Sequence, residues 1–292
     1  MSSPYKNSIF DFIIFSNIFI ALCAVVMTAY TMHLFTDEFP PLSFIGFIFF
    51  STLASYSIHW YLTDETVEVT DARTSWLAKY KNVHALFFII SAVGCIYFLM
   101  KELSYIKWIL PAVVLTLIYT APKFPFRPFT SLKKFILAKT ALLALMWTYV
   151  TSALPLLITE REWQTVHTLF FLNRFTLIFP ICILFDIRDK EFDKSIGIKS
   201  LVTLLPFSKL KIIFDIIIIL NIILSIVLSY YYLEGTVDNF ILLIPTFLTY
   251  VLYHRAIKTK NDYLFYFTLD GLMAFSPILY FLKIMMRSAI LS

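Results

Sequence analysis

The chain alternates between long apolar runs and short polar segments along its whole length. A helix needs about 20 apolar residues to cross a bilayer, and nine runs come close to that length. The predicted spans cover residues 9–32, 42–62, 83–100, 104–121, 135–158, 166–186, 212–233, 239–254 and 263–286. This pattern predicts an all-α, polytopic membrane bundle of nine transmembrane helices.

The polar segments between these runs are too short to form a separate soluble domain. We therefore expect residues 1–292 to fold as a single intramembrane domain. The first apolar run is too long for the core of a signal peptide, and no small-residue cleavage site follows it. We expect this run to remain in the protein as a transmembrane helix.

The composition supports a membrane protein, since 60% of the residues are hydrophobic, 18% aromatic and only 15% charged. A soluble domain is usually nearer half apolar and a quarter charged, so a soluble enzyme, a disordered chain and a secreted scaffold are disfavoured. The three cysteines, Cys23, Cys95 and Cys182, lie in apolar runs without C-x-x-C spacing, which argues against a disulfide framework.

The formal net charge of +5 fits basic residues collected on one membrane face better than nucleic-acid binding. With the N-terminus in the cytoplasm, most of the 24 Lys and Arg residues fall in cytoplasmic segments. The opposite face then holds only Lys101, Lys107, Arg161, Lys283 and Arg287. We expect an inner-membrane protein whose C-terminus lies outside.

Three aspartates, Asp186, Asp189 and Asp193, follow the sixth predicted span at positions i, i+3 and i+7. On a helix they would project from one face, where they would repel one another unless a hard cation lay among them. Mg²⁺ prefers carboxylate oxygens and often shares its ligand shell with phosphates. Gly197 is expected to end the helix, and Lys199 and Ser200 follow as phosphate contacts.

A simpler interpretation of the same stretch is a solvated loop of mixed charge. Basic and acidic residues interleave with the aspartates, namely Arg188, Lys190, Glu191 and Lys194. The one-face spacing and the position at a membrane boundary favour the metal site, because a charge there is costly without a partner.

The pattern D-x-x-D-x-x-x-D followed by G-x-K-S resembles the second aspartate-rich motif of the UbiA-type intramembrane prenyltransferases. The segment Tyr119-Thr120-Ala121-Pro122-Lys123, with the basic residues after it and Trp147 and Pro155, is similar to another segment of that family. The resemblance implies helices around a central cavity and transfer of an isoprenyl chain from a prenyl diphosphate to an acceptor in the membrane.

The resemblance also implies the cofactor and the site residues. Mg²⁺ would bridge the diphosphate to aspartates, here Asp186, Asp189 and Asp193, which would act as the catalytic and metal-binding residues. The diphosphate would contact basic side chains, here Lys123, Arg127, Lys139, Arg188 and Lys199. A lysine at position 139 either extends to the headgroups or points inward at an anion. The expected partners are a prenyl diphosphate, a membrane-soluble acceptor and the lipid bilayer, with no nucleic acid.

The first aspartate motif of that family, N-D-x-x-D-x-x-x-D, is missing from the end of the second span, where Ser57 and His59 stand. A substitute exists slightly later, because Asp64, Glu68 and Asp71 are spaced i, i+4 and i+7. The alternative is an acidic solvated loop. His59 is either a metal ligand or a hydrogen-bonded histidine near the membrane interface.

The missing motif keeps a second function open, that of a family member that binds an isoprenoid without turning it over. A secondary transporter is disfavoured, because nine spans do not divide into two equal repeats and there are only five glycines.

Four further polar residues fall within the spans. Arg174 is too far from Asp186 along the helix to pair with it. Asn221 is expected to make an interhelical hydrogen bond. Asp215 has either a structural role or a place in the polar site. Asp270 is a functional candidate because it is an intramembrane carboxylate, although no role follows from the sequence.

Overall fold

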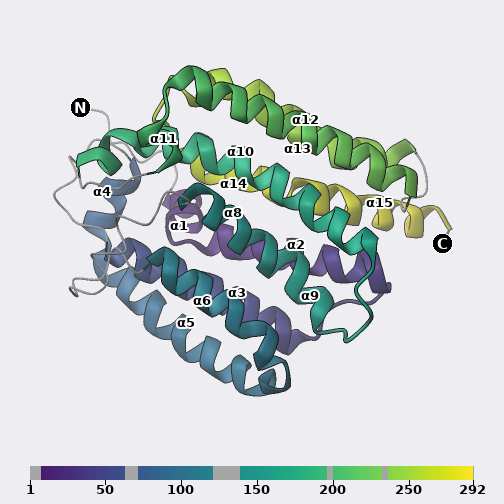
Figure 1. Ribbon diagram of the computed structural model, residues 1–292. Helices are drawn as coiled ribbons and strands as arrows, with labels where there is room; N and C mark the ends of the chain where they lie inside the picture. The colour runs from purple at the N-terminus through teal and green to yellow at the C-terminus, as the bar shows by residue number, and fades with distance from the viewer. Residues whose placement is uncertain (1–7, 63–71, 121–138, 196–199, 232–235, 292) are drawn as a thin grey trace.

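The computed structural model describes residues 8–62, 72–120, 139–195, 200–231 and 236–291, and these form helices joined by short connections. The first half contains α1 (Ser8–Phe15), α2 (Ile18–Thr36), α3 (Leu42–Tyr61), α4 (Ala72–Lys79), α5 (Lys81–Lys101), the 3₁₀ turn η1 (Leu103–Tyr105) and α6 (Ile106–Thr120). The fold prediction of an all-α membrane bundle is confirmed (Figure 1).

The second half begins with α8 (Lys139–Thr148), the π-helical turn η4 (Tyr149–Ala153) and α9 (Leu154–Leu157). It continues with α10 (Thr165–Ser195), α11 (Leu201–Leu204), α12 (Phe207–Tyr231) and α13 (Thr236–Ala256). The π-helical turn η5 (Leu264–Leu269), α14 (Asp270–Met273) and α15 (Phe275–Leu291) complete the chain.

Seven helical segments in the described residues are long and apolar enough to cross a membrane. An eighth span is present if the segments Leu264–Met273 and Phe275–Ala289, which meet at a bend of 56°, count as one. The predicted span 239–254 corresponds to a shorter apolar helix, Phe240–Ala256. Each predicted span therefore has a helical counterpart, while the total of nine transmembrane helices and the central cavity stay predictions.

The first predicted span, 9–32, is wrong as a single helix. The backbone breaks between α1 and α2 at Asn17, whose φ of 70° lies in the left-handed region. Asparagine tolerates this conformation better than most side chains, so the break is compatible with the sequence. The break separates α1 from α2 and buries Asn17 at 1% exposure.

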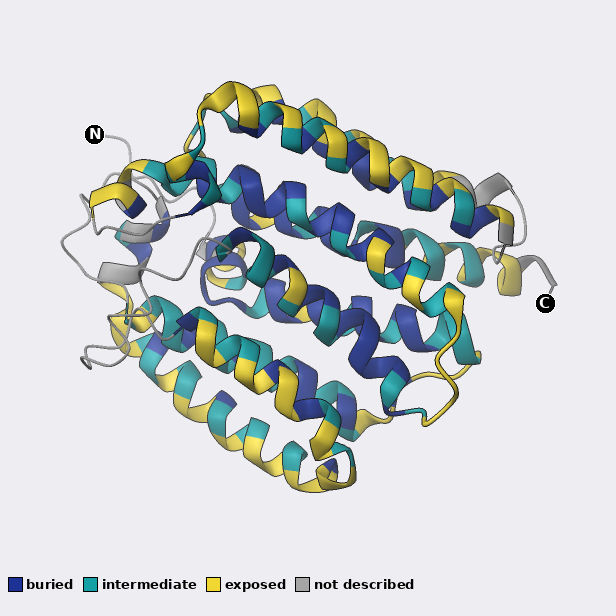
Figure 2. Cartoon of the chain, in the orientation of Figure 1, coloured by how far each residue is buried: buried dark blue, intermediate teal, exposed yellow. Residues whose placement is uncertain are grey.

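Burial divides the helices into an inner and an outer group (Figure 2). Most of α10 and of the α8–α9 segment is buried, and the core joins them to α2, α3 and α14. By contrast, α5 and α12 expose large apolar side chains, such as Ile89, Val93, Ile216 and Ile223. An exposed apolar surface of this kind suits contact with lipid, as a transmembrane bundle requires.

Two glycines let α3 and α5 approach closely. A Cβ added at Gly46 would lie 2.6 Å from the ring of Phe98, and one at Gly94 would lie 2.7 Å from the ring of Phe50. The rings of Phe50 and Phe98 stack with their centroids 5.7 Å apart. Small residues that admit a neighbouring side chain are typical of helix packing in membranes.

Candidate active site

The three aspartates lie on the last turns of α10, which stays helical through Ser195. Asp186 and Asp193 are buried, with exposures of 6% and 2%. Seven residues are nearly two full turns of an α-helix, so these two carboxylates point the same way, while Asp189 is rotated away from them. The predicted helix is present, but only Asp186 and Asp193 point the same way, and Asp189 points to a different side.

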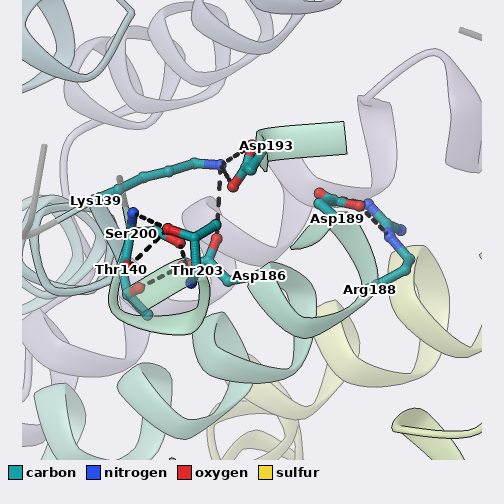
Figure 3. Close-up of polar contacts among 8 residues, drawn as sticks. All are labelled: Lys139, Thr140, Asp186, Arg188, Asp189, Asp193, Ser200 and Thr203. Atoms are coloured by element: carbon teal, nitrogen blue, oxygen red, sulfur yellow. Dashed lines mark hydrogen bonds and ion pairs between the residues drawn. The ribbon is translucent and has the colours of Figure 1, made fainter. Parts of the chain in front are cut away.

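Lys139, the first residue of α8, brings Asp186 and Asp193 together (Figure 3). Its Nζ lies 2.9 Å from Oδ2 and 3.1 Å from Oδ1 of Asp193, and 3.7 Å from Oδ1 of Asp186. The Thr140 hydroxyl donates to Oδ2 of Asp186. Of the two orientations open for Lys139, the structure therefore has the one that points inward at anionic groups.

Asp189 faces a different partner. Nε of Arg188 lies 2.7 Å from Oδ1 of Asp189, and Nη2 lies 3.2 Å from Oδ2, so the guanidinium contacts both oxygens. The Asp189 side chain is 38% exposed, whereas that of Arg188 is only 8% exposed. The Arg188 guanidinium lies over the rings of Phe185, Phe265 and Tyr266 at 4.6–5.2 Å. The rings hold the guanidinium in place beside Asp189.

A second buried arginine, Arg73 of α4, shares the ring of Tyr266 with Arg188. Its guanidinium lies 3.9 Å from the centroid of Tyr266 and 4.0 Å from that of Trp60. Its Nη2 donates to Oδ1 of Asn17, and its backbone N–H donates to Oδ2 of Asp262, both at 2.7 Å. Burial lowers the pKa of Arg73 from its usual value.

Sequence reasoning missed Asn17, Arg73, Asp262 and Tyr266, which come from three distant segments. The sequence gave little indication that these residues belong to a site, since a lone arginine near a predicted loop and a tyrosine in an apolar run are common. The break at Asn17 places the side chain of that residue beside α4, but the apolar pattern of the sequence gave no sign of this break.

In the described parts of the chain, no three His, Cys, Asp or Glu side chains are close enough together to hold a metal ion. The two carboxylates that meet at Lys139 still suit Mg²⁺ chemically, because Mg²⁺ is commonly bound by one or two carboxylates with waters and substrate phosphates. Here the Lys139 ammonium supplies the positive charge that this pair of buried anions needs.

Several predicted site residues lie outside the described residues, namely Lys123, Arg127, Lys199, Asp64, Glu68 and Asp71. Their roles remain predictions. At the end of α3, Ser57 is fully buried and the ring of His59 stacks on that of Tyr119 with centroids 5.6 Å apart. In the described part of α3, a buried hydroxyl and an imidazole ring therefore stand where the resemblance implies carboxylates.

The other intramembrane polar residues are largely explained by packing. Asn221 of α12 donates to the backbone oxygen of Asn173 at 2.7 Å and to Oγ1 of Thr176 at 2.9 Å, which confirms the interhelical hydrogen bond. Arg174 lies over the rings of Tyr30 and Phe170. Asp215 pairs with Lys211 one turn away on the same helix.

The model of the UbiA prenyltransferase family matches residues 63–264, which is more than half of the chain. The match includes α10 with its three aspartates, Lys139 and both arginines beside Tyr266. No curated protein and no solved structure is similar enough to be matched to the chain.

Proposed function

Because the chain belongs to the UbiA prenyltransferase family, we propose that it transfers an isoprenyl chain from a prenyl diphosphate to a lipid-soluble acceptor, with Mg²⁺ as the cofactor. The observation that carries this proposal is the pair of buried carboxylates, Asp186 and Asp193, that meets one lysine at the end of a membrane helix. Ionisable groups at such a place are rare, are usually paired as here, and commonly mark a substrate or ion pathway.

Asp186 and Asp193 are the proposed main ligands of Mg²⁺, and Asp189 joins them once it leaves Arg188. The bound metal would neutralise the diphosphate and so make it a better leaving group. Asp64, Glu68 and Asp71 remain proposed as a second acidic group.

Lys139 and Arg188 are the proposed diphosphate contacts among the described residues, with Lys123, Arg127 and Lys199 proposed beyond them. Lys139 holds three N–H donors on a flexible stem, so it can exchange a carboxylate oxygen for a phosphate oxygen without moving its backbone. Hydrogen-bond donors that are already in place then stabilise the charge on the leaving diphosphate. Such preorganised electrostatic stabilisation is usually the largest single contribution to enzymatic rate enhancement.

Aromatic rings near these residues suit the allylic cation that forms when the diphosphate leaves. Phe185, the neighbour of Asp186 in the chain, packs against the same buried apolar cluster as Tyr56. Tyr56 accepts a hydrogen bond of 3.0 Å from Nε1 of Trp147. Ring faces stabilise nearby cations, and rings exclude the water that would otherwise quench the allylic cation.

We propose that the protein lies in the inner membrane, with the three aspartates at the cytoplasmic face and the C-terminus at the opposite face. The excess of Lys and Arg in the segments on that side supports this orientation. Cysteine accessibility at Lys258→Cys and Arg287→Cys, which lie in segments assigned to opposite faces, tests it.

A non-catalytic isoprenoid-binding protein is the second candidate. The end of α3 favours it, since Ser57 and His59 stand where the resemblance implies carboxylates. In that case the chain would bind a prenyl diphosphate with Mg²⁺ but would release no inorganic diphosphate.

The test uses the full chain in nanodiscs with prenyl diphosphates of increasing length, Mg²⁺ and a panel of lipid-soluble acceptors. Catalysis predicts Mg²⁺-dependent release of inorganic diphosphate together with a prenylated product. Binding of an inert prenyl thiodiphosphate without turnover supports the second candidate. If the protein binds no prenyl thiodiphosphate, both proposals are wrong.

A further inference from the structure

Arg174 is a buried cation in the membrane-spanning part of α10, about 18 Å along the helix axis from Asp186. The residue is only 4% exposed, and its Nη1 is buried without a hydrogen-bond partner. Within the described residues, neither a hydrogen bond nor an ion pair reaches its guanidinium. Ionisable groups in membrane helices are rare and are usually paired, so a buried cation of this kind points to a ligand.

The aromatic contacts of Arg174 hold its guanidinium but do not balance its charge. The guanidinium lies 4.9 Å from the ring centroid of Phe170 and 5.6 Å from that of Tyr30. A ring face attracts a cation but offers no oxygen acceptor to the five N–H groups. Water accepts such hydrogen bonds but carries no charge, so it would leave a buried cation without a counter-ion. An anion meets both requirements.

The guanidinium lies at the depth where the lipid headgroups meet the hydrocarbon. Arg174 is nine residues after Thr165, the first residue of α10, which corresponds to about 14 Å. Its side chain points back toward Phe170, one turn earlier, as long side chains on helices do. The guanidinium is therefore about 8 Å from the start of α10, where the exposed Trp163 is typical of a membrane interface. A headgroup region is about 5–7 Å deep, so the guanidinium lies near its inner boundary, on the face opposite the aspartates.

A buried hydroxyl lies at the same level on α12. Asn173 donates to Oγ of Ser225 at 2.8 Å, so this face of α12 is turned toward α10. Ser229 is one turn later on the same face, and Asn173 and Thr176 contact α12 in the order expected of antiparallel helices. Ser229 is 7% exposed, and within the described parts of the chain its Oγ has no hydrogen-bond partner. Two neighbouring helices therefore each provide an unpartnered donor near the start of α10.

The surroundings restrict the anion to the headgroup of a lipid. Tyr30 and Phe170 pack with Leu228 and Leu242 in one buried apolar cluster. A free inorganic ion would lose its hydration there, which is costly for a charge. The partly buried Tyr280 of α15 borders the same cluster, so the acyl chains of a lipid could follow the apolar surface outward from it.

The charge and shape of the guanidinium favour one type of headgroup. One guanidinium balances one negative charge, and a phosphodiester carries one. The two free oxygens of a phosphodiester also match the forked N–H groups of arginine, which bind phosphate in a bidentate manner.

We propose that Arg174 and Ser229 bind the phosphodiester group of a phospholipid in the leaflet opposite the three aspartates. The bound lipid holds together α2, α10, α12 and α13, which supply the cluster around the guanidinium. This site is separate from the proposed active site, so it does not depend on prenyl transfer.

The test uses the full chain purified in detergent and supplied with phosphatidylglycerol, whose headgroup carries a single phosphodiester charge. Native mass spectrometry counts the bound lipid, and thermal unfolding measures the stabilisation that binding provides. Wild type is expected to retain one phosphatidylglycerol. Arg174→Met removes the charge but keeps an unbranched side chain, so affinity should fall by at least about tenfold, as loss of a charge-assisted hydrogen bond predicts.

Arg287→Met is the matched control. Arg287 is exposed on α15, which ends near the place where α10 begins (Figure 1). This variant removes a positive charge from the same end of the bundle and should bind phosphatidylglycerol as wild type does.

Two further lipids separate the phosphodiester from other sources of affinity. Dioleoylglycerol has acyl chains without a phosphate, and oleate carries a carboxylate. Neither should be retained by wild type as strongly as phosphatidylglycerol. Four results overturn the proposal: wild-type affinity in Arg174→Met, equal retention of dioleoylglycerol, stronger retention of oleate, or no retention of phosphatidylglycerol by wild type.

A measurement on wild type alone keeps the proposal testable if Arg174→Met does not fold. Phosphatidylglycerol with a photoreactive diazirine in its headgroup is cross-linked to the protein, and the labelled peptides are identified by mass spectrometry. Labelling at the start of α10 and the end of α12 is expected. Labelling confined to α5, which lies apart from this cluster, would show that the site is wrong.

Discussion

Two sides of the end of α10 hold buried charge in different ways. On one side the ammonium of Lys139 lies between Asp186 and Asp193, and on the other side the guanidinium groups of Arg188 and Arg73 lie against aromatic rings. A lysine ammonium is a point charge on a flexible stem, whereas a guanidinium is planar and is fixed by stacking. The lysine side is therefore suited to exchanging partners, and the arginine side to holding its shape.

This difference assigns separate roles to the two sides. The carboxylates beside Lys139 should carry the metal-dependent chemistry, since a metal or a phosphate can replace the lysine as their partner. Arg73 beside Tyr266 should hold α4 against η5, since it also bonds Asn17 and Asp262. Each side can be changed separately by substitution, and the change on the lysine side should lower activity most.

Asp193→Asn should have the largest effect. It removes a carboxylate that is 2% exposed and contacts Lys139 through both oxygens, so transfer is expected to fall by at least about 100-fold. Breaking a buried pair is also expected to destabilise the protein by about 3–5 kcal/mol. Initial rates in nanodiscs and thermal unfolding in detergent measure the two effects.

Asp215→Asn is the control for this change, because Asp215 pairs with Lys211 on a more exposed surface, where an i,i+4 pair contributes only about 0.3–0.5 kcal/mol. If Asp193→Asn transfers as fast as Asp215→Asn, the lysine side does not carry the chemistry.

Arg73→Lys should affect stability more than chemistry. The ammonium keeps the charge but loses the planar contact with Trp60 and Tyr266, so we expect a loss of about 1–3 kcal/mol and a rate reduced by about tenfold. Thermal unfolding measures the loss of stability, and initial rates measure the loss of activity. Lys79→Arg on the same helix is exposed and should leave both values unchanged. An unchanged melting temperature for Arg73→Lys would contradict the structural role.

Gly94→Ala should have the smallest effect on activity, because it lies on α5, away from both sides. Its Cβ would lie 2.7 Å from the ring of Phe50, so overpacking should destabilise the bundle by about 1–3 kcal/mol. The rate per folded molecule should not change. Gly271→Ala is the control for stability, since its nearest neighbour, Phe19, would be 3.4 Å away. Equal stability of the two variants would show that the close approach of α3 and α5 is unimportant.

Much of the fold followed from the sequence because lipid imposes a simple rule, that a spanning segment must be apolar over its length. The spans near 42–62 and 104–121, for example, agree with α3 and α6 to within a few residues. The break at Asn17 and the bend after Met273 did not follow, since they depend on packing and on backbone conformation rather than on hydrophobicity.

Residue spacing alone predicted the site only where its residues lie close in sequence, and Lys139 was predicted from the family resemblance. Asp186, Asp189 and Asp193 share one helix, so their spacing carried the signal. The division of these aspartates between Lys139 and Arg188 depends on contacts between α8, α10 and η5, which no local pattern contains. Arg73 could not be predicted from a local pattern either, because its partners are spread from residue 17 to residue 266.

The most direct test of the central claim is a cryo-electron microscopy structure of the full chain in nanodiscs with Mg²⁺ and an inert prenyl thiodiphosphate. The account predicts phosphate density beside Asp186 and Asp193, with the Lys139 ammonium donating to a phosphate oxygen and Arg73 still stacked on Tyr266. Phosphate density elsewhere, with Lys139 still bound to both oxygens of Asp193, would contradict it.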